Sequence, residues 1–272
     1  MRSNEVIGRE AANACRKEWK LGFTPIGNLP KLIEDRCKVG VALIHTDSPG
    51  HGMTMQLGDH TIMAVGCTPH PMRLQSTLAH ELGHLRIGTV NRQLGSKGWE
   101  KRSPEEIQAD SFARHFLLPT EALKGFGKQS HELELSNLVQ NFRVSPAIAA
   151  IQMRDSGLID EQLCIEFGTI STKTLAAKFG WLSEYNALAA ASLTPRPPQA
   201  LMARAVEAYQ WRQISASALA RLQGEKETTR FEKALEQQGI TPSPISTSPA
   251  RPTPADGGLT PAEIEVLMNG ET

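Results

Sequence analysis

The stretch that organises this chain is Arg73-Leu-Gln-Ser-Thr-Leu-Ala-His-Glu-Leu-Gly-His-Leu-Arg86. Its leucines recur at the three- and four-residue spacing of one helix face, which predicts an amphipathic helix with a buried stripe. Prolines precede this stretch and Gly88 follows its last apolar residue, as expected at the two ends of a helix. The helix would place His80 and His84, four residues apart, on the same face.

These two histidines can point their imidazoles at one metal ion. Glu81 lies one position from His80, close enough to reach a water molecule beside that ion without binding the metal itself. This is the H-E-x-x-H arrangement of zinc peptidases. The alternative is an amphipathic helix that carries two surface histidines and a glutamate and binds nothing. A third ligand on another element favours the metal site, because catalytic zinc usually has three protein ligands.

The best candidate for the third ligand lies in residues 103–119, which begin with Ser103 as a helix N-cap and end at a proline. Glu106 and Asp110 share one face with two alanines, whose small side chains would let this helix pack closely against the first. We expect Glu106 to bind the metal and Asp110 to accept the free ring N–H of one ligand histidine. Two alternatives stay open. Ser103-x-x-Glu106 is also a capping box, and Glu105 could be the ligand.

Two segments together resemble the ImmA/IrrE family of metallopeptidases, namely Leu78-Ala-His-Glu-Leu-Gly-His-Leu85 and Glu106-x-x-Ala-Asp-x-Phe-Ala-x-x-Phe-Leu-Leu-Pro119. The spacing between the segments is similar to that family's as well. The resemblance extends upstream through a predicted hairpin and, more loosely, downstream to about residue 160. It implies a zinc endopeptidase that cleaves a helix-turn-helix transcriptional repressor at a specific site and so switches gene expression. The repressor is often encoded beside the peptidase.

The resemblance also implies roles for individual residues by their position in the motifs. His80, His84 and Glu106 match the zinc ligands, and Glu81 matches the catalytic acid–base. Asp110 stands where the family often has asparagine, and both side chains can accept a histidine N–H. Two other functions remain open: the protease member of a toxin–antitoxin or phage-defence pair, and a protein-binding regulator with a silent metal site.

Composition gives no sign of nucleic acid or an anionic membrane as the partner. The 272 residues contain 29 Lys and Arg against 29 Asp and Glu, so the formal net charge is zero. No apolar run approaches the length of a membrane span, and the N-terminus lacks the apolar region of a signal peptide. The four cysteines form no C-x-x-C pair and are expected to be reduced, mostly buried thiols. We therefore expect a cytoplasmic protein.

The predicted fold class is α+β. Residues 4–20 and 29–37 are expected to be helices, residues 39–44 a buried strand, and residues 53–57 and 61–65 a β-hairpin. The resulting three-stranded sheet would pack on zincin-type helices, and an all-helical region would follow. An open edge strand of this sheet would lie beside the metal cleft, where an extended substrate could add to it through main-chain hydrogen bonds.

We expect a zinc metallopeptidase domain at residues 1–125 and a helical domain at residues 126–240. A Pro/Ser-rich linker with a short terminal helix would occupy residues 241–272. Within the helical domain, residues 133–159 read as a helix-turn-helix. Residues 131–161, however, contain five acidic residues and only two arginines, whereas a DNA-binding unit should be basic. This unit is therefore predicted to be structural or to dock a repressor, and direct DNA binding is not expected.

Overall fold

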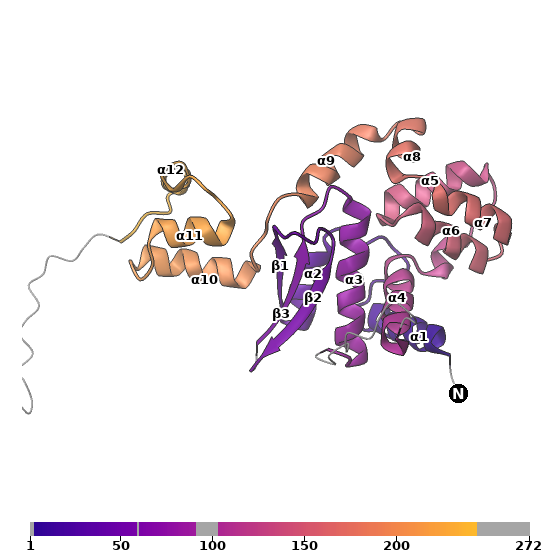
Figure 1. The fold of residues 1–272 in the computed structure, drawn as a ribbon, viewed down its shortest axis with the longest axis horizontal. Coiled ribbons are helices and arrows are strands. Elements are labelled where there is room, and N and C mark those ends of the chain that lie inside the picture. The colour runs from indigo at the N-terminus through magenta and orange to yellow at the C-terminus, as the bar shows by residue number, and fades with distance from the viewer. Residues whose placement is uncertain (1–2, 59, 91–102, 244–272) are drawn as a thin grey trace, which may run out of the picture.

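The computed structural model describes residues 3–58, 60–90 and 103–243. These residues form an α+β fold in which a small sheet has helices on both sides of it, which confirms the predicted fold class (Figure 1). The helices are α1 (Asn4–Glu18), α2 (Leu29–Cys37), α3 (Pro71–Ile87), α4 (Pro104–Leu117), α5 (His131–Phe142), α6 (Pro146–Asp155), α7 (Glu161–Thr169), α8 (Thr172–Lys178), α9 (Leu182–Ser192), α10 (Gln199–Gln210), α11 (Ala216–Gln223) and α12 (Thr228–Gln237), with a short 3-10 helix at Thr120–Leu123.

The sheet contains β1 (Gly40–Ile44), β2 (Gly52–Leu57) and β3 (His60–Gly66) in the order β1-β3-β2. The hairpin of β2 and β3 is antiparallel, as predicted, and β1 joins β3 in parallel. One face of the sheet packs into the core through Val41, Leu43, Met63 and Val65. The other face carries side chains that are 41–50% exposed, namely Ile44, Met53, Met55 and Ile62. Among the described residues, β2 is an edge strand that no further strand covers.

The helices α3 and α4 lie close together, with α3 between the sheet and α4 (Figure 1). The contact depends on small residues. A side-chain carbon on Gly83 would lie 3.1 Å from the Cα of Ala109, and Ala109 and Ala113 are both buried. The predicted close approach through alanines is therefore confirmed. Gly88 ends α3 in the left-handed conformation, with a φ of 79° that glycine adopts without strain.

The first helix, α1, packs along α4 and supports it. Gly8 allows this approach, since any side chain there would overlap the carbonyl oxygen of Gln108. Ser111 Oγ donates to the carbonyl of Glu5 at 2.7 Å, and Gln108 Nε2 donates to Asn4 Oδ1 at 3.0 Å. Two faces of α4 are thus fixed by packing, which limits the positions that side chains near its N-terminus can take.

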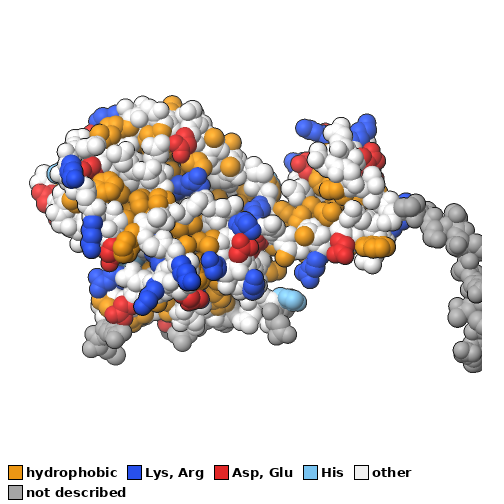
Figure 2. All heavy atoms as spheres, turned by 180° about the vertical axis from the view of Figure 1, so that it is seen from behind, with side chains coloured by type: hydrophobic (Ala, Val, Ile, Leu, Met, Phe, Trp, Pro, Cys, Tyr) orange, Lys and Arg blue, Asp and Glu red, His pale blue; other side chains and the backbone are white. Residues whose placement is uncertain are grey.

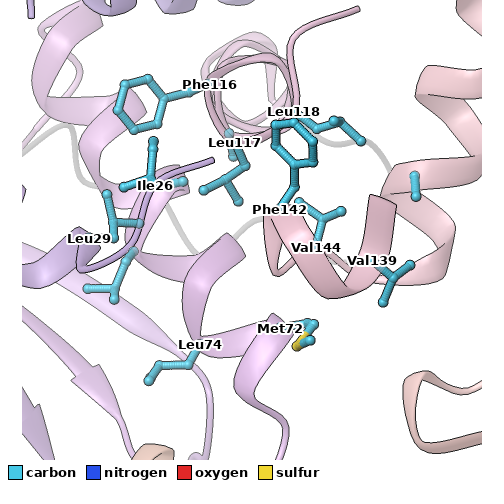
Figure 3. Close-up of a cluster of buried hydrophobic side chains, with 14 of the residues drawn as sticks. Ile26, Leu29, Met72, Leu74, Phe116, Leu117, Leu118, Val139, Phe142 and Val144 are labelled. Carbon is cyan, nitrogen blue, oxygen red and sulfur yellow. The ribbon is translucent and has the colours of Figure 1, made fainter. Parts of the chain in front are cut away.

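Among the described residues, one large hydrophobic core includes buried side chains from α1 to α9. Figure 3 shows side chains of α3, α4 and α5 that meet in it, among them Met72, Leu74, Phe116, Leu117 and Phe142. A second, smaller core lies among α10, α11 and α12, around Leu219 and Tyr209. These helices form a lobe at one side of the main body (Figure 2). On the face in Figure 2, positive and negative side chains are interspersed. The domain boundaries expected at residues 125 and 240 stay a prediction.

The segment between α9 and α10 connects this lobe to the sheet. Arg196 and Leu43 exchange two backbone hydrogen bonds, of 2.8 and 2.9 Å, along the outer side of β1. The guanidinium of Arg196 also donates to the carbonyl of Val41 at 2.7 Å and pairs with Glu34. This segment therefore covers part of the β1 edge of the sheet, whereas no strand among the described residues pairs with the outer edge of β2.

The predicted helix-turn-helix is confirmed as α5 and α6, with Arg143 in the left-handed conformation between them and Ser145 as the N-cap of α6. All four cysteines are unpaired, and Cys37 alone is only half-buried. In the described ranges, no helix combines the length and the apolar composition needed to span a bilayer. The predicted terminal helix at residues 260–268 and most of the linker before it lie outside the described residues.

His115 is a buried histidine on α4 and is 5% exposed. Its Nδ1 lies 3.3 Å from Nε2 of Gln152, which also donates to the carbonyl of Leu118. Burial, together with the nearby positive charges of Arg114 and Arg9, lowers the pKa of His115 to about 4. The folded protein therefore holds this ring in its neutral form.

This histidine should make the protein less stable in mild acid. The unfolded chain protonates His115 as the pH falls through 6.5, whereas the folded chain resists until about pH 4. Above pH 6.5 the neutral ring costs the folded protein no stability. Between pH 6.5 and about pH 4, the free energy of unfolding falls by about 1.4 kcal/mol for each pH unit. Urea unfolding of the metal-free protein measures the free energy of unfolding at pH 7.0 and at pH 4.5. The decrease between these two pH values should be about 2–3 kcal/mol smaller in His115→Gln than in the wild type. Equal losses in the two proteins would contradict this.

Candidate metal centre

Three side chains from two helices meet at one point. His80 and His84 stand one turn apart on α3, and their Nε2 atoms are 3.0 Å apart. Glu106, near the N-terminus of α4, lies 3.3 Å from each of them, with Oε2 toward His80 and Oε1 toward His84. Among the described residues, these three form the group of His, Cys, Asp or Glu side chains whose ligand atoms lie close enough together to hold a metal ion. The structure thus brings together the three predicted ligands.

The position of Glu106 favours one of the alternatives that the sequence left open. Ser103 does cap α4, since its Oγ accepts the backbone N–H of Glu106 at 3.3 Å. The carboxylate of Glu106, however, lies against the two histidines, and Glu105 is not part of this group. Hydrogen bonds from His80 and His84 hold the pKa of Glu106 well below its usual range. Glu106 is therefore a carboxylate anion directed at the same point as both imidazoles.

Asp110 lies one turn further along α4, on the other side of the His80 ring. Its Oδ1 is 2.9 Å from His80 Nδ1, as predicted for the residue that orients a ligand histidine. Burial of His80 disfavours its charged form, but hydrogen bonds to Asp110 and Glu106 outweigh this and raise the pKa of His80 to about 9. An N–H at Nδ1 leaves the Nε2 lone pair for a metal ion.

The second histidine has a partner that the sequence reading did not find. His84 Nδ1 lies 2.8 Å from Oγ1 of Thr89, which follows the helix-ending Gly88. A glycine C-cap turns the chain back toward the last helical turn, so a polar residue directly after it could have been recognised as a possible partner. Both imidazoles thus have an oxygen at Nδ1 and direct Nε2 to the same point.

Glu81 is only 7% exposed and is fixed by the edge strand β2. Thr54 Oγ1 donates to Glu81 Oε2 at 2.8 Å. Gly52 lies so close that a side-chain carbon there would be 2.8 Å from Glu81 Cγ. No local pattern could have identified Thr54, because the contact depends on how β2 sits against α3. Glu81, which follows His80 in the sequence, is therefore held by β2 and is not one of the three residues of the group.

Comparison with known proteins agrees with this geometry. The Peptidase_M78 family model, described as the IrrE N-terminal-like domain, matches residues 39–154. A search of curated proteins gave no match. The matched residues run from the start of the sheet to α6 and include every residue of the centre named above. The supporting helix α1 and the lobe α10–α12 lie outside the match.

Proposed function

Because residues 39–154 form a metallopeptidase domain of the ImmA/IrrE family, we propose that this chain is a zinc-dependent endopeptidase. Its substrate is a helix-turn-helix transcriptional repressor, which it cleaves at a specific site to switch gene expression. The observation that carries the proposal is the meeting of His80, His84 and Glu106 beside the separately held carboxylate of Glu81.

The donor atoms suit zinc in both kind and spacing. Zinc in catalytic sites binds imidazole nitrogen and carboxylate oxygen at about 2.0–2.2 Å in a tetrahedral arrangement, which separates neighbouring ligand atoms by about 3.3 Å. The two nitrogen–oxygen distances here are 3.3 Å, and the distance between the two nitrogens is 3.0 Å. Two imidazoles and one carboxylate are also the donor set of known zinc peptidases, whereas magnesium and calcium prefer oxygen ligands.

Zinc supplies a Lewis acid that polarises a peptide carbonyl and makes a water molecule more acidic. The protein supplies the group that moves the proton. Thr54 holds the carboxylate of Glu81 through Oε2, and this carboxylate takes the proton from the attacking water and later gives it to the leaving amine. Burial of Glu81 and its hydrogen bond to Thr54 keep this carboxylate in one orientation, which general acid–base catalysis requires.

The open edge of β2 is the proposed binding site for an extended substrate segment. The unpaired main-chain groups of an edge strand can add one more strand by hydrogen bonding. A segment bound there would lie beside the strand that holds Glu81 through Thr54. We also propose that the reaction takes place in the cytoplasm, since four unpaired cysteines suit a reducing compartment.

N-terminal proteomics tests this function without knowledge of the substrate. Cells that express the wild type are compared with cells that express Glu81→Gln, and new protein N-termini are identified. The proposal predicts one new N-terminus, dependent on Glu81 and located in a helix-turn-helix regulator. Many new termini would favour the protease of a toxin–antitoxin or phage-defence pair. If no terminus appears and the purified chain lacks metal, the protein is a binding regulator with a silent metal site.

A further inference from the structure

The C-terminal cap of α3 and the metal centre share one residue, His84. Its backbone carbonyl accepts the N–H of Gly88 at 3.0 Å and the N–H of Thr89 at 2.9 Å, so it closes the helix. The Thr89 hydroxyl also lies 3.4 Å from this carbonyl and 2.8 Å from the ring nitrogen Nδ1 of the same histidine. One side chain directly after the helix therefore contacts both the backbone and the ring of His84.

These contacts are compatible with a His84 ring that carries its proton on Nδ1. A threonine hydroxyl has one hydrogen and two lone pairs. If that hydrogen points to the His84 carbonyl, the oxygen accepts from Nδ1–H, and the lone pair of the neutral ring is then on Nε2. Nε2 is the atom that lies 3.3 Å from Glu106 and faces the proposed metal position. The left-handed Gly88, with its φ of 79°, turns the chain so that Thr89 can reach the ring.

We propose that Thr89 is a positioning residue that fixes the tautomer and orientation of His84 for metal binding, as Asp110 does for His80. This inference rests on the proposed function, because it assumes that the centre binds zinc. The two ligand histidines then have chemically different partners. His80 has an anionic partner at Nδ1, whereas His84 has a neutral hydroxyl. Outer-shell hydrogen bonds of this kind typically change metal affinity by about 10–100-fold.

The test measures zinc affinity and needs no substrate. The full-length chain is stripped of metal and titrated with zinc in competition with a chromophoric chelator at pH 7.5. Thr89→Val keeps the shape of the side chain but removes the hydroxyl, and should weaken zinc binding about 10–100-fold. Thr89→Ser keeps the hydroxyl and should bind zinc within about threefold of the wild type. Thermal unfolding of the three metal-free proteins should be similar, since the backbone cap of α3 is retained.

Three results would overturn the inference. The first is zinc affinity in Thr89→Val equal to that of the wild type. The second is equal weakening in the valine and serine variants, which would indicate a packing role. The third is a loss of zinc affinity in Thr89→Val that is matched by a loss of metal-free stability. Wild-type protein that binds no zinc at all would instead overturn the proposed function, and this inference with it.

Discussion

Glu81→Gln should reduce cleavage of the cellular substrate by about 100- to 10,000-fold, the range that general acid–base catalysis contributes. Glutamine keeps the size of the side chain and an oxygen that can accept from Thr54, but it cannot take up a proton from water. Zinc content should stay at one equivalent, because Glu81 is not among the three residues whose donor atoms converge. The measurement is the rate at which the new N-terminus appears, together with metal analysis of the purified variant.

The matched control for this prediction is Glu166→Gln, which makes the same chemical change on an exposed residue of α7. It should cleave at the wild-type rate. Cleavage by Glu81→Gln within about tenfold of the wild type would remove Glu81 from the mechanism, since that is less than general acid–base catalysis normally contributes. Loss of zinc in Glu81→Gln would instead indicate that Glu81 binds the metal.

His80→Ala should lose both zinc and activity. It removes one of the three converging donor atoms and leaves Asp110 without its imidazole partner. We expect zinc affinity to fall by more than about 100-fold, beyond the effect of losing one outer-shell hydrogen bond. Metal analysis after dialysis against micromolar zinc should give about one equivalent for the wild type and close to none for the variant.

The control for the metal prediction is His131→Ala, because His131 is exposed at the start of α5 and takes no part in the centre. Its zinc content should equal that of the wild type. Full metal content in His80→Ala would show that the metal binds elsewhere. Glu106→Ala adds a second comparison, and should behave like His80→Ala if the two helices hold one ion together.

Much of the metal centre was predictable because its signals are local. His84 lies four positions after His80, and a helix converts that spacing into a shared face. Ser103 places the start of α4, which fixes where Glu106 and Asp110 lie along it. The pairing of α3 with α4 was predictable from alanine positions, and the close contact of Gly83 with Ala109 is its physical basis.

Other parts of the site depend on tertiary packing that no local pattern records. Thr54 reaches Glu81 because β2 lies beside α3, and the sequence separation of 27 residues carries no sign of this. The support of α4 by α1 depends on Gly8, which looks like an ordinary helical glycine in the sequence. Arg196 pairs with β1 across more than 150 residues, which only the folded chain brings together.

The position of the metal ion tests most directly whether His80, His84 and Glu106 together bind zinc. Crystals of the zinc-loaded chain would be measured at X-ray energies above and below the zinc absorption edge. We predict a single anomalous peak about 2.0–2.2 Å from His80 Nε2, His84 Nε2 and a carboxylate oxygen of Glu106, with Glu81 near it but not bonded. No peak at this position in zinc-saturated crystals, or a peak bonded to Glu81 or Glu105 in place of Glu106, would contradict it.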